Sequence, residues 1–213
     1  MQPTLIESTQ IASATAGLKT QGVLVVIPAT DVQMAQRAAA LASSRAGVAA
    51  TVLIVLDTAR MGLVRVHNEV FKHTQSTHYA YLAQDAFVGR DWLSLGLDAL
   101  ERQNAALLGF NDGKWQGQLA SFGLAKRDWV NTLYNGSFFF EGYKSHYADT
   151  ELTLIAREQH RYAYEPNAVV MEVDWSKDAH PSTSAEDKSL FKARAKTGFA
   201  NRVTRPELLG LFS

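Results

Sequence analysis

Residues 22–57 read GVLVVIPATDVQMAQRAAALASSRAGVAATVLIVLD. Two runs expected to be buried strands, 23–27 and 50–56, flank an alanine-rich segment over 31–44 whose apolar positions recur about every 3.6 residues. Apolar runs without alternation are typical of strands that are buried on both faces, as in a parallel sheet. Asp31 stands where a helix N-cap is expected. The stretch therefore predicts a strand–helix–strand unit with a right-handed crossover.

The same alternation of strands and helices continues along the chain. The first 20 residues predict only an arm or a short helix, and the polar stretch 176–187 predicts a loop. We expect further strands over 79–82, 106–110 and 162–172, and helices over 62–73, 91–106, 149–160 and 188–196. This order predicts an α/β fold with a mostly parallel, mixed sheet flanked by helices.

The composition excludes several classes of protein. With 21 basic and 21 acidic residues the net charge is zero, so a nucleic-acid partner is not expected. The absence of cysteine excludes disulfide scaffolds, thiolate zinc sites and a cysteine nucleophile. The longest apolar runs have five or six residues, whereas a bilayer span needs about 20. Without a signal-peptide pattern at the N-terminus, a cytoplasmic protein is expected.

Acidic residues follow the predicted strands. Asp31 comes soon after the first strand, Asp57 directly after the second and Asp85 shortly after the third. In open α/β sheets ligands bind outside the carboxyl ends of the strands. Three acids there favour a polar ligand with a hard cation such as Mg²⁺ or Mn²⁺. Asp is also a common turn residue and helix cap, so a purely structural interpretation of each acid stays open.

Common phosphate-binding and catalytic motifs are missing. The sequence has no GxxxxGK[ST], which disfavours a Walker-type phosphate loop. It has no GxGxxG after the first strand, which disfavours a nicotinamide-binding unit. It also lacks GxSxG and HExxH, so neither an α/β-hydrolase nor a zincin is expected.

Six segments occur in an informative order: VVIPAT, LIVLD, RVHN, YLAQDAFVGRDWL, HYADTELTLIAR and YAYEPNAVV. Together, over residues 23–174, they resemble the inverting nucleotide-sugar glycosyltransferases of the GT-A fold, the large family-two group. The resemblance implies one GT-A domain over 1–213. Residues 21–106 would bind the nucleotide, residues 107–180 would shape the acceptor site, and residues 181–213 would form a C-terminal helix and tail.

The resemblance also implies the site residues on the donor side. Residues next to the nucleotide would be Pro28, Ala29, Thr30, Asp57, Arg65, Asn68 and Asp85. Asp57 would contact the base, and Asp85 would hold the Mn²⁺ or Mg²⁺ that bridges the diphosphate. Two departures are visible. Ala83 replaces the first acid of the family's Asp-x-Asp motif, and Glu172 stands near the usual histidine ligand. Glu172 is therefore expected as a second metal ligand, because carboxylates bind these cations well.

Asp149 matches the family's catalytic base, which would accept the proton of an attacking acceptor hydroxyl. The expected acceptor is a glycan or another hydroxyl compound, as in polysaccharide biosynthesis. It could also be a membrane-associated acceptor, with the protein bound peripherally at the inner face of the membrane. A structural interpretation stays open, since Asp149 and Glu151 are both acids in the first turn of a predicted helix, where its dipole favours anions.

Two other functions remain open. The incomplete Asp-x-Asp motif is compatible with a degraded site, and hence with a nucleotide- or sugar-binding protein or a partner in glycan assembly. A nucleotidyltransferase shares the strand-end acids, but the segment Pro28-Ala29-Thr30-Asp31 lacks the glycine- and arginine-rich loop of that class. Trp115 is either buried or part of an aromatic wall for a sugar, and the basic C-terminal segment is either a solvated helix face or a tail that meets the diphosphate or an anionic, membrane-associated acceptor.

Overall fold

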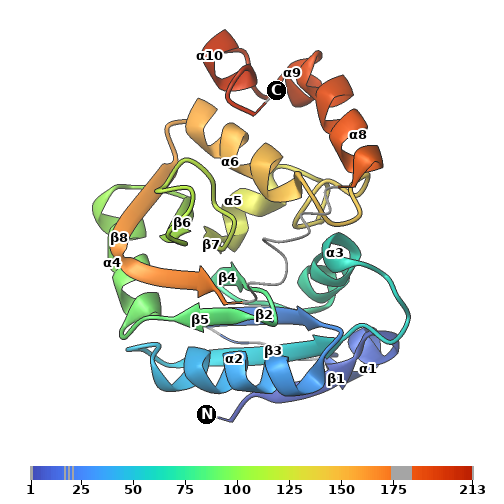
Figure 1. Cartoon of the computed structure of the whole chain (residues 1–213), viewed down its shortest axis with the longest axis vertical. Coiled ribbons are helices and arrows are strands. Elements are labelled where there is room, and N and C mark those ends of the chain that lie inside the picture. Colours follow the sequence, from blue (N-terminus) through green and yellow to red (C-terminus); the bar gives the residue numbers. More distant parts are fainter. Residues whose placement is uncertain (1, 17, 19, 21, 174–183, 213) are drawn as a thin grey trace.

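The fold is built on a mixed sheet of eight strands in the order β1-β3-β2-β4-β7-β6-β8-β5. The computed structural model describes residues 2–173, except 17, 19 and 21, together with 184–212 (Figure 1). The strands are β1 (Thr4–Glu7), β2 (Val23–Ala29), β3 (Ala50–Leu56), β4 (His78–Tyr81), β5 (Ala86–Val88), β6 (Leu107–Asn111), β7 (Gly123–Lys126) and β8 (Tyr162–Glu172). The pairs β1/β3, β3/β2, β2/β4 and β6/β8 are parallel, and the pairs β4/β7, β7/β6 and β8/β5 are antiparallel.

Helices cover both faces of the sheet. Those described are the 3-10 helix η1 (Ser8–Gln10), α1 (Ile11–Ala14), α2 (Val32–Ser44), α3 (Leu63–His73), α4 (Trp92–Arg102), α5 (Arg127–Asn131), α6 (Ala148–Glu158), α8 (Ala185–Ala195), α9 (Gly198–Asn201) and α10 (Pro206–Leu209). One hydrophobic core contains side chains of α2 and α4, and the other contains side chains of α3, α5, α6 and α8. Figure 1 shows α8, α9 and α10 beyond α6, on the side away from α2.

Strand β2 explains why both cores form. Leu24 and Val26 belong to the core with α3 and α6, whereas Val23, Val25 and Ile27 belong to the core with α2 and α4. Successive side chains of a strand point to opposite faces, so an unbroken apolar run serves both layers. The two-face burial predicted for this run is confirmed.

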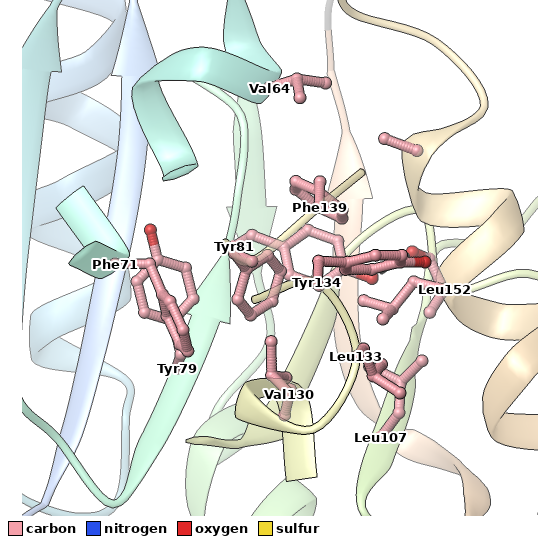
Figure 2. Packing of buried hydrophobic residues seen from close by; sticks show 14 of the residues in the cluster. Val64, Phe71, Tyr79, Tyr81, Leu107, Val130, Leu133, Tyr134, Phe139 and Leu152 are labelled. Carbon is pink, nitrogen blue, oxygen red and sulfur yellow. Dashed lines mark hydrogen bonds between the residues drawn. The ribbon is translucent and has the colours of Figure 1, made fainter. Parts of the chain in front are cut away.

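An aromatic cluster fills the core beneath α3. The ring centroids of Phe71 and Tyr79 lie 5.4 Å apart, and those of Tyr81 and Phe139 lie 5.3 Å apart. Figure 2 shows these four side chains packed together. Phe138 and Phe139 of the triple-phenylalanine segment over 138–140 are buried in this core, and Phe140 is partly buried against it.

Several local predictions are corrected. Residues 4–7 form strand β1, which pairs in parallel with β3, and not an arm or a helix. The helix expected over 91–106 ends at Arg102. Helix α8 begins at Ala185, inside the predicted loop over 176–187, while residues 176–183 lie outside the described part of the chain. Asp31 caps α2 as predicted, accepting hydrogen bonds from the backbone N–H groups of Gln33 (2.9 Å) and Met34 (3.0 Å).

No helix in the described ranges is both long enough and apolar enough to span a bilayer.

Candidate functional site

A cavity of about 220 Å³ lies at the carboxyl ends of β2 and β3, next to the loop that follows β4; we name it the strand-end cavity. The described residues that line it are Pro28, Ala29, Thr30, Asp57, Gly62, Leu63, Ala83 and Gln84. The structure thus brings together four of the residues predicted to surround a nucleotide. Their proximity follows from the parallel pairing of β2 with both neighbours, which places the carboxyl ends of these strands at one edge.

Two side chains fix the walls of the strand-end cavity. The carboxylate of Asp57 accepts hydrogen bonds from the backbone N–H groups of Met61 (2.8 Å) and Gly62 (2.8 Å), which closes the turn into α3. Gln84 Oε1 accepts hydrogen bonds from the backbone N–H groups of Thr30 (2.7 Å) and Asp31 (2.9 Å). Gln84 therefore ties the end of β2 to the loop after β4, a role that the sequence did not indicate.

The predicted pair on α3 lies elsewhere. Arg65 is exposed and does not line the strand-end cavity. Asn68 is buried, and its side-chain amide forms two hydrogen bonds with the backbone of Phe139. Nδ2 donates to the carbonyl oxygen at 3.1 Å, and Oδ1 accepts from the N–H at 2.8 Å. Asn68 thus anchors the aromatic segment, and nucleotide contacts of these two residues stay predictions.

Asp85 and Glu172 do not converge. Asp85 is 2% exposed and lines a neighbouring cavity of about 350 Å³ between α2 and β5, which shares Gln84 with the strand-end cavity. The carbonyl oxygen of Asp85 accepts a hydrogen bond from the Val173 N–H (3.1 Å), and Ala86 pairs with Glu172. Asp85 lies in the turn before β5, and Glu172 is not among the residues that line its cavity.

These positions limit the kind of metal site that fits. Glu172 Oε2 lies 3.2 Å from Lys114 Nζ, away from the Asp85 cavity. Within the described ranges, no group of three or more acidic or histidine side chains is placed to hold a metal ion. The metal-binding roles of Asp85 and Glu172 therefore stay predictions. A cation bound by Asp85 alone would take its other oxygens from phosphates and water, a mode common for Mg²⁺.

Asp149, in the first turn of α6, lines a cavity of about 520 Å³ that we name the Asp149 cavity. Its Oδ1 accepts a hydrogen bond from the Thr150 N–H at 2.8 Å. Burial raises the pKa of Asp149 to about 6; the Thr150 hydrogen bonds oppose this rise, and the negative charge of Asp112 adds to it. A carboxylate with a pKa near the working pH is well suited to general base catalysis.

Glu151, the other acid in this turn, has a different environment. It is fully buried and accepts hydrogen bonds from Arg194 Nε and Nη2, both at 2.7 Å. The hydroxyl groups of Tyr134 (3.0 Å) and Tyr143 (2.9 Å) also donate to it. Glu151 therefore links α6 to α8 inside the protein, while Asp149 faces the cavity.

The loop over 144–146 separates the two cavities. The Val64 N–H, in the first turn of α3, donates to the carbonyl oxygen of Lys144 at 3.3 Å. Gly62, which lines the strand-end cavity, has a φ of +84°, and a Cβ there would lie 3.0 Å from the same carbonyl oxygen. Ser145 and His146 line the Asp149 cavity. The two cavities therefore adjoin across one loop.

Asp187 of α8 holds this loop in place. Its carboxylate accepts hydrogen bonds from the N–H groups of Lys144 (3.0 Å), Ser145 (3.0 Å) and His146 (2.9 Å). Burial opposes the ionisation of Asp187, but these backbone donors outweigh it and lower its pKa. Sequence reasoning missed Asp187 because it lies in a polar stretch without a motif, about 40 residues from its partners.

Known structures share this fold. No family model and no curated protein matches the chain. S. aureus TarS 1-349 in complex with UDP-GlcNAc aligns with a TM-score of 0.65 at 12% identity over 90% of this chain and 71% of that chain. PcManGT from Pyrobaculum calidifontis, a mannosyltransferase in complex with GDP-Man and Mn²⁺, aligns with a TM-score of 0.58 at 12% identity over 96% and 73%.

Glucosyl-3-phosphoglycerate synthase from Mycobacterium tuberculosis, in complex with Mn²⁺, UDP-Glc and phosphoglyceric acid, aligns with a TM-score of 0.52 at 12% identity over 93% of this chain and 85% of that chain. These structural neighbours are GT-A-type nucleotide-sugar glycosyltransferases. The GT-A fold predicted from the ordered segments is confirmed. At this level of identity the likeness establishes the fold, and the activity has to be argued from the residues of this chain.

Proposed function

We propose that this protein transfers a sugar from a nucleotide diphosphate donor to a hydroxyl acceptor, with Asp149 as the general base. The observation that carries the proposal is the pair of adjoining cavities at one edge of a GT-A sheet. One is lined by strand-end residues, and the other contains a carboxylate with a pKa of about 6. The nucleotide sugars bound by the structural neighbours support the donor class.

The two cavities divide the chemistry between them. Residues 28–30 and Asp57 would contact the nucleoside, while Asp149 would accept the proton of the acceptor hydroxyl. As that oxygen bonds to the anomeric carbon, the bond from this carbon to the diphosphate oxygen breaks, and attack from the opposite side inverts the anomeric centre. Base catalysis of this kind contributes about 10²–10⁴-fold. When bound, Mn²⁺ or Mg²⁺ would neutralise charge on the diphosphate, with Asp85 as its protein ligand.

A second candidate function is favoured by two specific observations. Ala83 replaces one acid of the metal motif, and Glu172 is not among the residues that line the Asp85 cavity. A protein that binds a nucleotide or a sugar without transferring it, as a partner in glycan assembly, would need neither a complete metal site nor a base.

Two measurements separate these functions. Calorimetric titration of UDP and GDP, with and without Mn²⁺, tests the donor site, and a panel of nucleotide sugars screened by thermal shift identifies the donor, because a ligand that binds the native state raises its stability. The Asp149→Asn variant should lose at least about 10²-fold in transfer rate. Its affinity for the donor should stay within about twofold.

The matched control is Asp98→Asn, which makes the same change at an exposed position on α4. This variant should transfer sugar at the parental rate. Unchanged turnover in Asp149→Asn would remove this residue from the mechanism. Donor binding without turnover for any acceptor would favour the binding protein.

A further inference from the structure

The described residues that line the Asp149 cavity include no lysine or arginine. They are Trp115, Leu119, Ser145, His146, Tyr147, Asp149, Thr150, Leu211 and Phe212. His146 is the one among them whose side chain can become positive, and its Nδ1 lies 3.5 Å from the backbone N–H of Ser184. A phosphate or carboxylate group would enter beside the carboxylate of Asp149 and near that of Asp112, with no lysine or arginine among the described lining residues, so this wall disfavours an anion.

Part of the cavity wall is aromatic and partly open. Trp115 is 40% exposed, which is unusual for so large an apolar side chain. Its ring meets that of Phe212 edge to face, with centroids 5.9 Å apart and planes at 71°. Leu211, 47% exposed, extends the apolar surface. An exposed indole edged by apolar groups is a platform for the C–H face of a sugar ring, which is apolar while its hydroxyl groups are not.

Hydrogen bonds to Asp112 fix the turn that carries Trp115. Asp112, which follows β6 and is 5% exposed, accepts hydrogen bonds from the N–H groups of Lys114 (2.9 Å) and Trp115 (2.8 Å) through Oδ1. Its Oδ2 accepts a hydrogen bond from the Ser121 hydroxyl at 2.5 Å. The turn that carries Trp115 is therefore fixed before a ligand arrives, and preorganisation of this kind lowers the entropic cost of binding.

We infer that the Asp149 cavity receives an uncharged sugar as acceptor, with one sugar face on Trp115 and a hydroxyl group at Asp149. Trp115 and Phe212 then determine acceptor specificity. A volume of about 520 Å³ lies within the range of about 300–1,000 Å³ typical of small-molecule sites. This inference rests on the proposed function, because it assigns the acceptor of that reaction, and it favours an uncharged glycoside over an anionic, membrane-associated acceptor.

Binding is tested directly with small probes. Methyl glycosides of glucose, galactose, mannose and N-acetylglucosamine are compared with glucose 6-phosphate, glucuronic acid and 3-phosphoglycerate. The readouts are saturation-transfer NMR and quenching of tryptophan fluorescence. We expect at least one methyl glycoside to bind, with the strongest saturation transfer at its ring C–H protons, and no anion to bind. Preferred binding of an anion, or no binding of any uncharged glycoside, overturns the inference.

Variants locate the binding on the platform. Trp115→Ala should weaken glycoside binding by about tenfold, which corresponds to the loss of one aromatic contact. Trp115→Phe should restore part of the lost affinity. Leu5→Ala, at an apolar residue on β1 that is 43% exposed, is the matched control and should leave binding unchanged. Equal binding by Trp115→Ala and the parent overturns the inference. Thermal unfolding of each variant verifies that it is folded.

Donor titration distinguishes this failure from failure of the proposed function. If the protein binds UDP or GDP and transfers sugar only to anionic acceptors, the proposed function stands and the acceptor inference falls. If no nucleotide binds but a methyl glycoside binds at Trp115, the sugar site stands while the transferase proposal falls.

Discussion

Replacing Asp149 by asparagine should stabilise the protein at neutral pH. The carboxyl group has an ordinary pKa of 3.8, whereas burial raises it to about 6 in the folded protein. Between these values the folded state holds a proton that the unfolded state has lost, so the free energy of unfolding falls as the pH rises from about 4 to 6. Above pH 6 both states are ionised, and the folded state bears the full cost of the half-buried charge. At about 1.4 kcal/mol for each tenfold change in the ionisation constant, this cost is about 3 kcal/mol.

Asparagine removes this cost and keeps the local hydrogen bonds, because its Oδ1 can still accept from the N–H and hydroxyl groups of Thr150. The free energy of unfolding at pH 7 should rise by up to about 3 kcal/mol. At about 2–4 °C per kcal/mol for a chain of this size, the melting temperature should rise by up to about 6–12 °C. At pH 4 the gain should vanish, since the parent carboxyl group is then protonated in the folded state.

Urea unfolding of parent and variant at pH 4 and pH 7 measures this difference, with Asp98→Asn as the exposed control that should show no gain at either pH. A stability difference for Asp149→Asn that does not change between the two pH values would refute the reasoning. In that case the folded-state pKa of Asp149 would lie near its ordinary value, and the electrostatic support for its role as a base would disappear.

Four further outcomes follow from the same contacts. The value of kcat/KM for sugar transfer should fall about tenfold per pH unit below about pH 6, because Asp149 must be ionised to accept a proton. In urea unfolding, Arg194→Met should lower the free energy of unfolding by about 3–5 kcal/mol, because it leaves the buried Glu151 without its ion-pair partner. Arg102→Met should lower it by less than about 1 kcal/mol, because the arginine of that ion pair is 62% exposed. Asp187→Ala should speed amide hydrogen exchange in the loop before α6, measured by mass spectrometry. Removing divalent cations with EDTA should weaken UDP binding in calorimetry, and Asp85→Asn should make that binding insensitive to Mn²⁺.

The sequence predicts long elements of this fold better than short ones. The runs that form β2 and β3 have seven residues each and are apolar on both faces, so local pattern and tertiary position agree. Strand β7 has four residues, Gly123–Lys126, with no β-branched side chain, and β5 has three. Such segments become strands only because a neighbour pairs with them, β4 and β6 for β7 and β8 for β5. No local signal can carry that information.

The same limit applies to the candidate site. Topology alone places Pro28, Thr30 and Asp57 at one edge, because parallel strands end there together. The residue that lies opposite Glu172 depends on the register between β5 and β8, which pairs Glu172 with Ala86, and the local sequence of a three-residue strand does not set that register. Gln84 completes one wall of the strand-end cavity through hydrogen bonds to backbone N–H groups that are 53 and 54 residues away in the chain. No local motif encodes such contacts.

Asp149 and Glu151 show this limit most clearly. They stand two residues apart in one helical turn, so their side chains leave the axis about 200° apart and must meet different surroundings. Helix propensity and the helix dipole favour both acids equally, and neither tells which one faces the core. The orientation of the helix depends on Arg194 of α8, 43 residues after Glu151, and on two tyrosine hydroxyl groups. These groups form an ion pair and hydrogen bonds with Glu151 inside the protein. With the inward-facing position occupied by a paired carboxylate, the helix is anchored firmly enough to keep Asp149 at the cavity despite the cost of its charge. The contacts of Glu151 with Arg194, Tyr134 and Tyr143 therefore help to hold Asp149 in the buried position that suits it to accept a proton.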